Sequence, residues 1–157
     1  MYCSHLMNVL RRTIPAGAVD PTADPALLQQ VAALCTRQTD KGVKVLLVQS
    51  SRGRWILPKG WPMDGRTDAE AAKLEAWEEA GVAKGDVTKA PIARYITQKR
   101  FDDGRVAPCL VTVYAIAVKA MTKDYPEVDL RKRRWVKPKR AIKLVSEDGL
   151  KDILRDL

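Results

Sequence analysis

Histidine and cysteine are scarce in this sequence of 157 residues, which limits the kinds of site it can hold. The chain has one histidine, His5, and three widely spaced cysteines, Cys3, Cys35 and Cys109, with no C-x-x-C pair. Such a set suits neither a disulfide framework nor a zinc site, which needs clustered Cys and His ligands. We therefore expect neither, and a reducing cytoplasm is the expected compartment.

Long apolar runs are also missing. No stretch reaches the roughly 18 to 20 residues that a membrane span needs. Residues 1–12 lack the apolar core of a signal peptide. We therefore expect a soluble protein with no membrane partner, and the length corresponds to a single domain.

Positive charge is abundant. The chain has 28 Lys and Arg against 19 Asp and Glu, a net charge of +9, which indicates an anionic partner. The run R-K-R-R-W-V-K-P-K-R at 131–140 is the densest basic segment. It can serve as an electrostatic funnel for highly phosphorylated substrates or as a patch for RNA. We interpret its single aromatic residue, Trp135, as part of the core.

Residues 1–26 show no sustained periodicity and are expected to form a flexible N-terminal arm, which leaves 27–157 as the folded domain. β-branched and aliphatic residues predict several strands. They lie at 30–37, 43–50, 55–57, 93–100, 106–118 and 133–137. Asp103-Gly104 predicts a two-residue hairpin turn.

A helix is predicted at 68–80. Thr67 and Glu70 form a capping-box pattern at its start, and Gly81 is a suitable stop. Further helices are expected after Pro138 and after Ser146, the latter residue acting as an N-cap. Strands, helix, strands and helix in this order predict a mixed sheet of the α/β or α+β type.

Three glutamates, Glu75, Glu78 and Glu79, lie on one side of the 68–80 helix, and alanines lie on the other. We expect this side to face outward, where the like charges repel one another and lie at the helix end that disfavours negative charge. No Lys or Arg lies four residues from any of them. A solvated acidic face is one reading. The other is a site for Mg²⁺ or Mn²⁺, which are hard ions that prefer carboxylate oxygens.

Residues 60–82 resemble the Nudix box, G-x5-E-x7-R-E-U-x-E-E-x-G-U, where U is a bulky aliphatic residue. Gly60 matches the first glycine, the three glutamates match those of the box helix, and Gly81-Val82 closes the motif. Arg66, Leu74 and Ala76 depart from it. The resemblance covers roughly residues 28–157 and is greatest to the branch of diphosphoinositol polyphosphate and diadenosine polyphosphate hydrolases.

This resemblance implies a mixed sheet between helices and a metal-dependent hydrolysis of a diphosphate linkage. It assigns the metal, Mg²⁺ or Mn²⁺, to Glu75, Glu78, Glu79 and the backbone carbonyl of Gly60. Glu78 and Glu79 are the expected catalytic residues. Glu78 is a further ligand or the base that activates water, and Glu127 is the alternative base.

Two of the departures bear on the positions of the glutamates. The family residues that Arg66 and Leu74 replace normally pair with one another or with glutamates of the box. Leu74 removes a cation beside the carboxylates, and Arg66 is close enough in sequence to restore part of that charge. We therefore expect weaker positioning and a site that remains active.

Basic residues before the box are expected to hold the substrate phosphates, because arginine can bind phosphate in a bidentate way. The candidates are Ser51, Arg52, Arg54 and Lys59, with Lys99 and Arg100 of second rank. The leading function is hydrolysis of a small polyphosphorylated molecule, either a dinucleoside polyphosphate or an inositol pyrophosphate. The alternatives are an RNA 5′-end pyrophosphohydrolase and a non-catalytic Nudix domain that binds nucleotide or RNA.

Overall fold

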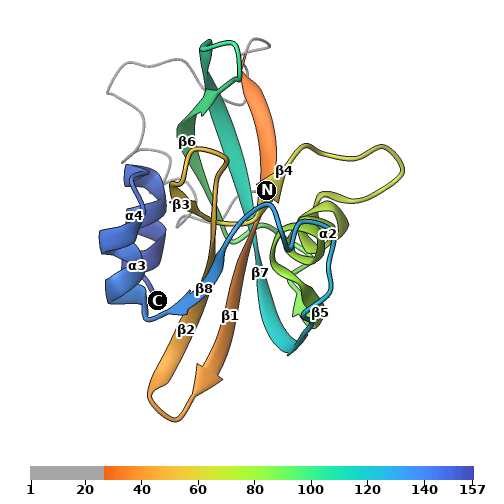
Figure 1. The fold of residues 1–157 in the computed structure, drawn as a ribbon, viewed down its shortest axis with the longest axis vertical. Coiled ribbons are helices and arrows are strands. Elements are labelled where there is room, and N and C mark those ends of the chain that lie inside the picture. The colour runs from red at the N-terminus through yellow and green to blue at the C-terminus, as the bar shows by residue number, and fades with distance from the viewer. Residues whose placement is uncertain (1–26) are drawn as a thin grey trace.

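The computed structural model describes residues 27–157, and the predicted arm at 1–26 lies outside them. Eight strands form one mixed sheet with helices on both faces (Figure 1). The strands are β1 (Leu28–Thr39), β2 (Gly42–Gln49), β3 (Trp55–Ile56), β4 (Lys59–Gly60), β5 (Val82–Val87), β6 (Ala93–Arg100), β7 (Val106–Met121) and β8 (Arg133–Val136). The helices are α2 (Asp68–Ala80), α3 (Pro138–Leu144) and α4 (Asp148–Arg155). The predicted mixed sheet between helices is confirmed.

β1 and β7 form the centre of the sheet and run parallel, whereas the other strand pairs in the described chain are antiparallel. β2 and β4 pair with β1, and β5 and β6 pair with β7. Apolar side chains fill both faces of β1, as expected for a strand buried on both sides. Val31 and Ala33 face the core beneath α2, while Ala32 and Leu34 face the core beneath α3 and α4.

Local sequence signals determine both ends of α2. The Thr67 hydroxyl accepts a hydrogen bond from the Glu70 N–H at 3.1 Å, and the Glu70 carboxylate accepts one from the Thr67 N–H at 3.4 Å. Gly81 ends the helix with φ of 70°, a conformation that favours glycine. The alanine side is buried against the sheet, which allows close approach of the helix. The predicted helix is confirmed at both ends.

Two predictions of local structure are wrong. The β6–β7 hairpin closes through the five residues 101–105, in which Phe101 N–H donates to Arg105 O and Gly104 takes φ of 88°, and so the turn is longer than two residues. α4 begins after Glu147 without a side-chain cap, and so Ser146 is not its N-cap.

Two strands escape the sequence analysis. β4 has only two residues, and β5 carries a glycine and two register shifts against β7, so neither gives a clear period of two. Within residues 27–157, no helix is long and apolar enough to cross a membrane.

Candidate functional site

Two of the three glutamates of α2 are buried, and the third is partly covered, so they do not form an exposed stripe. Glu75 and Glu79 are only 9% and 6% exposed, and Glu78 is half-buried. The segment 122–132, which links β7 to β8, runs back along α2, where Glu127 N–H donates to Glu78 O at 2.9 Å. This segment and β4 flank the side of α2 that carries the glutamates. The expectation that this side faces solvent is therefore wrong, and the glutamates line a candidate site instead.

β4 lies directly against two of these carboxylates. The backbone N–H of Lys59 donates to Glu79 Oε2 at 2.8 Å. A Cβ atom added to Gly60 would overlap the Glu75 carboxylate, so only glycine fits there without displacement. The first glycine of the box therefore has a physical reason to be glycine, and its backbone adjoins the predicted metal ligands.

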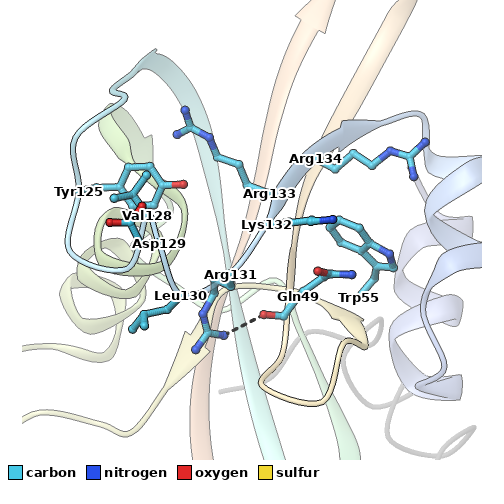
Figure 2. Close-up of a pocket in the computed structure, with 10 residues that line it drawn as sticks. All are labelled: Gln49, Trp55, Tyr125, Val128, Asp129, Leu130, Arg131, Lys132, Arg133 and Arg134. Atoms are coloured by element: carbon cyan, nitrogen blue, oxygen red, sulfur yellow. Dashed lines mark hydrogen bonds between the residues drawn. The ribbon is translucent and has the colours of Figure 1, made fainter.

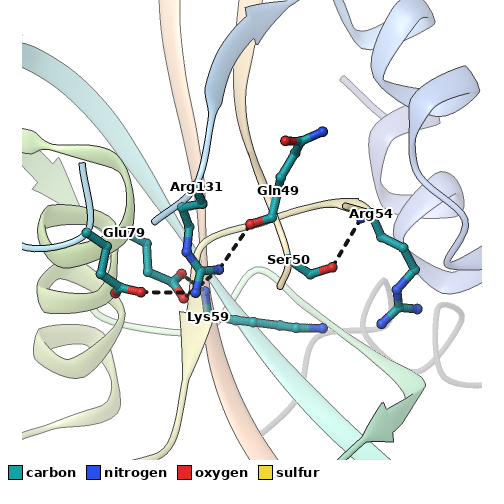
Figure 3. A network of polar contacts seen from close by, with 7 residues as sticks. Gln49, Ser50, Arg54, Lys59, Glu79 and Arg131 are labelled. Carbon is teal, nitrogen blue, oxygen red and sulfur yellow. Dashed lines mark hydrogen bonds and ion pairs between the residues drawn. The ribbon is translucent and has the colours of Figure 1, made fainter. Parts of the chain in front are cut away.

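Arg131 contributes a cation that the sequence analysis missed. Its Nη1 lies 3.4 Å from Glu79 Oε1 and its Nη2 donates to Glu127 Oε1 at 3.0 Å. Nη1 also donates to the backbone oxygen of Gln49 at 3.2 Å. Figure 3 shows this network, which connects α2, the end of β2 and the segment 122–132.

Two carboxyl groups of the site, those of Glu75 and Glu79, have pKa values well above the usual range. Burial, followed by the charges of Glu78 and Glu127, raises the pKa of Glu75 to about 7, and Arg131 lowers it in part. Burial raises the pKa of Glu79 to about 8, against the lowering effects of Arg131 and of the Lys59 N–H. The site is therefore costly to ionise without a further cation.

The donor chemistry fits Mg²⁺ or Mn²⁺. The buried carboxylates of Glu75 and Glu79, the half-buried ones of Glu78 and Glu127 and the Gly60 backbone offer hard oxygen ligands. In residues 27–157, however, no three Asp, Glu, His or Cys side chains already form a group that could hold a metal ion. Because Arg131 pairs with Glu79 and Glu127, and the Lys59 N–H binds Glu79, these contacts hold the carboxylates in their present arrangement.

The predicted phosphate-binding residues lie in one place. Together with both second-rank candidates they line a small pocket, formed by Ser50, Ser51, Arg52, Arg54, Ile56, Lys59, Gln98, Lys99 and Arg100. Arg52 donates to Phe101 O at 3.1 Å, which joins the loop before β3 to the β6–β7 hairpin. Lys59 connects this pocket to the carboxylates, because its backbone binds Glu79 and its side chain lines the pocket.

The side chain of Lys59 also has a partner that the sequence did not reveal. Its Nζ lies 3.2 Å from Oε2 of Glu147, the residue before α4, and both side chains are nearly buried. Lys59 thus links the carboxylate site to the opposite face of the sheet. The two residues lie far apart in the sequence and share no motif, so no sequence signal could have paired them.

Arg131 also lines a larger groove of about 720 Å³ (Figure 2). Its lining residues are Gln49, Trp55, Tyr125, Val128, Asp129, Leu130, Arg131, Lys132, Arg133 and Arg134. The exposure of the basic side chains alternates along 131–134. Lys132 and Arg134 are exposed, whereas Arg131 and Arg133 are half-buried. Trp135 packs partly against the core beneath α2, with the Arg37 guanidinium 4.3 Å from its ring.

Arg66 does not restore the charge that Leu74 removes. Both residues line a surface pocket with Glu70, Lys73 and Trp77 on the outer side of α2. Arg66 is exposed, and it is not among the charges that shift the pKa of Glu75 or Glu79. The cation beside these carboxylates is supplied by Arg131 instead.

The fold and the site together define a class of protein. It is a mixed-sheet domain in which the helix that covers one face, α2, carries buried glutamates beside a basic pocket. The family model of the NUDIX domain matches residues 28–157, so the chain belongs to the Nudix family. The resemblance seen in residues 60–82 is confirmed.

Relatives and solved structures agree with this assignment. Nudix hydrolase 12, mitochondrial, of Arabidopsis thaliana is 32% identical over 118 residues, which cover 73% of this chain and 58% of that protein. Human diphosphoinositol polyphosphate phosphohydrolase 3-alpha is 32% identical over 128 residues, which cover 79% of this chain and 73% of that protein. The structure of an Ap4A hydrolase from C. elegans matches with a TM-score of 0.62 at 19% identity and covers 82% of this chain and 93% of that one. This match shows a likeness of fold alone. The chain spans 58%, 66% and 59% of the lengths of three Arabidopsis relatives.

Proposed function

We propose that this protein is a hydrolase that cleaves a diphosphate linkage in a small polyphosphorylated substrate, with Mg²⁺ or Mn²⁺ as its cofactor. One observation carries the proposal: the buried carboxylates of Glu75 and Glu79, with the half-buried Glu78 and Glu127 beside them, are linked through Lys59 of β4 to a pocket lined by cations. Membership of the Nudix family supports the class of reaction. Relatives named as diphosphoinositol polyphosphate phosphohydrolases support the class of substrate.

The carboxylates and the Gly60 backbone would hold the metal. When bound, the metal offsets negative charge on the diphosphate and lowers the pKa of a bound water. Arg52 and Arg54 orient the phosphates from the neighbouring pocket by charge-assisted hydrogen bonds, and Lys59, whose ammonium pairs with Glu147, adds positive charge beside them. Water attacks phosphorus, the bond from phosphorus to the bridging oxygen breaks, and a glutamate accepts the proton of the water.

Glu78 and Glu127 are the two candidates for this base. The Glu127 carboxylate pairs with Arg131, and the Glu127 N–H donates to the backbone oxygen of Glu78. Both residues therefore lie at the same site. Comparing Glu78→Gln with Glu127→Gln distinguishes them. The base variant loses kcat, typically by about 10² to 10⁴-fold, because general base catalysis has that effect.

The test of the function is a panel of substrates with and without Mg²⁺ or Mn²⁺. It contains diadenosine polyphosphates, nucleoside diphosphate sugars, nucleoside triphosphates, inositol pyrophosphates and 5′-triphosphorylated RNA, each also incubated with Glu79→Gln. Metal-dependent release of phosphate or nucleotide that is lost in Glu79→Gln is the expected result. Binding of nucleotide or RNA without turnover of any member would instead indicate a non-catalytic Nudix domain.

A further inference from the structure

We infer that Arg131 is a positioning residue of the carboxylate site, and that it serves as the internal counter-ion which Leu74 does not provide at the arginine position of the box. The inference rests on the proposed function for its catalytic part. Its metal-binding part rests on the proposed metal ligands and is tested without turnover.

The Arg131 guanidinium joins three separate parts of the chain. It contacts Glu79 of α2 and the Gln49 oxygen at the end of β2 (Figure 3). It also pairs with Glu127 of its own segment, 122–132. The side chain is 18% exposed, and those of Glu79 and Glu127 are 8% and 23% exposed. Ion pairs in so little solvent are screened weakly, and the planar fork of arginine can hold two carboxylates at fixed angles.

Other cations near the site are engaged elsewhere. The Lys59 ammonium pairs with Glu147, and the side chain of Arg133 donates to the backbone oxygens of Ala80 and Thr122, both at 2.8 Å. Arg66 lines the outer pocket of α2. Arg131 is therefore the basic side chain that the described structure places in ion-pair contact with the α2 carboxylates.

A resident positive charge at this position has two opposite effects. It holds Glu79 and Glu127 in fixed orientations, which favours catalysis. It also satisfies the carboxylates electrostatically, so a divalent cation has to compete with it. These effects separate in an experiment, because a merely structural arginine would lower metal affinity and activity together when removed.

Arg131→Met, Arg131→Lys and the control Arg133→Met test the inference. Mn²⁺ binding is measured by calorimetric titration of each folded variant, whatever its turnover, and kcat is measured on any panel substrate that the wild type hydrolyses. Arg133→Met removes a charge from the same junction before β8. Its guanidinium donates to backbone oxygens and pairs with no carboxylate of residues 27–157. Urea unfolding of each variant shows that the titrated protein is native.

The expected result is a split between binding and turnover. Arg131→Met binds Mn²⁺ about tenfold more tightly, since removing the positive charge that pairs with Glu79 and Glu127 removes a competitor for these carboxylates, an effect of about this order. Its kcat falls by about tenfold or more, as is typical for loss of a residue that orients metal ligands. Arg131→Lys keeps Mn²⁺ affinity near that of the wild type but loses kcat, because an ammonium lacks the fork. Arg133→Met leaves Mn²⁺ affinity unchanged within about twofold, since contacts to neutral carbonyls do not compete with a metal.

Weaker or unchanged Mn²⁺ binding in Arg131→Met would overturn the inference, and so would equal tightening in Arg133→Met. An unchanged kcat in both Arg131 variants would overturn the positioning role. If the wild type turns over no substrate, the proposed function fails, whereas the Mn²⁺ comparison still decides whether Arg131 is the counter-ion.

Discussion

The backbone of Gly60 lies so close to the Glu75 carboxylate that a single added methyl group would overlap it. Gly60→Ala is therefore expected to displace Glu75 and to lower Mn²⁺ affinity. The loss should be about 10- to 100-fold, the range for disturbing a group that orients a metal ligand. Calorimetric titration with Mn²⁺ measures it.

Gly65→Ala is the control for this substitution. A Cβ on Gly65 meets open space, but its φ of 76° disfavours alanine and should cost about 1 to 2 kcal/mol of stability. This variant should lose stability and keep its Mn²⁺ affinity. Equal Mn²⁺ affinities for Gly60→Ala and wild type would show that Glu75 adjusts without consequence, or is not a ligand.

The buried pair of Lys59 and Glu147 gives a prediction for stability. Lys59→Met leaves the Glu147 carboxylate buried without its partner and should cost about 3 kcal/mol, as breaking one side of a buried pair does. Lys59→Met combined with Glu147→Leu should recover most of this loss, because no unpaired charge remains. Urea unfolding of the single and double variants measures the coupling. Additive effects of the two substitutions would mean that the pair contributes no interaction energy.

Sequence alone predicted those parts of the fold that depend on neighbouring residues. The capping box of Thr67 and Glu70, the stop at Gly81 and the alanine side of α2 are short-range patterns, and the structure confirms them. The preference of serine for N-cap positions is also a local signal, but at Ser146 the prediction was wrong. The helix α4 begins after Glu147, whose side chain forms a long-range pair with Lys59.

The candidate site shows the same division. Spacing along one helix brought together Glu75, Glu78 and Glu79, but it could not show that the helix side carrying them is enclosed. That burial comes from β4 and the segment 122–132, which are distant in sequence. The contact of Arg131 with Glu79 depends on the path of the same segment, and no residue pattern encodes it.

Cys35 is expected to be chemically inert in the folded protein. The side chain is fully buried under α2, and burial raises the pKa of its thiol to about 12, so almost no thiolate forms at pH 8. Cys109 is also buried, and burial raises its pKa to about 11. In a Cys3→Ser variant, iodoacetamide at pH 8 should modify neither residue until urea unfolds the chain, as read by mass spectrometry. Rapid modification of Cys35 in the native protein would show that the core beneath α2 opens, and rapid modification of Cys109 would show that the core beneath α3 and α4 opens.

Leu74→Arg restores the arginine of the box and tests whether Leu74 limits the enzyme. Because Arg131 already contacts Glu79, and Leu74 lines the outer pocket of α2, kcat should change by no more than about twofold, as for an exposed ion pair. Steady-state kinetics on a hydrolysed panel substrate measures this. A gain well above that size would mean that the site lacks a cation which Arg131 does not replace.

Trp61 offers a way to distinguish nucleotide from inositol substrates. Its side chain is 44% exposed directly after Gly60, and Lys99 Nζ lies 5.9 Å from the centre of its ring. Lys99 also lines the pocket that contains Arg54 and Lys59, so the indole borders the expected phosphate site. If a nucleobase stacks on it, Trp61→Ala should raise KM for diadenosine polyphosphates by about tenfold, since stacking contributes about 1 to 3 kcal/mol per base.

The comparison with inositol pyrophosphates completes this test, because these substrates have no aromatic base to stack. Their KM should stay within about twofold in Trp61→Ala, and Trp61→Phe should keep most of the affinity for diadenosine polyphosphates because it retains a ring. Both KM values are measured by phosphate or nucleotide release under the same Mg²⁺ concentration. Equal increases in KM for both substrate classes would show that Trp61 maintains the conformation of the loop after β4 and does not stack on a base. Any preference for a base would then have to come from other residues.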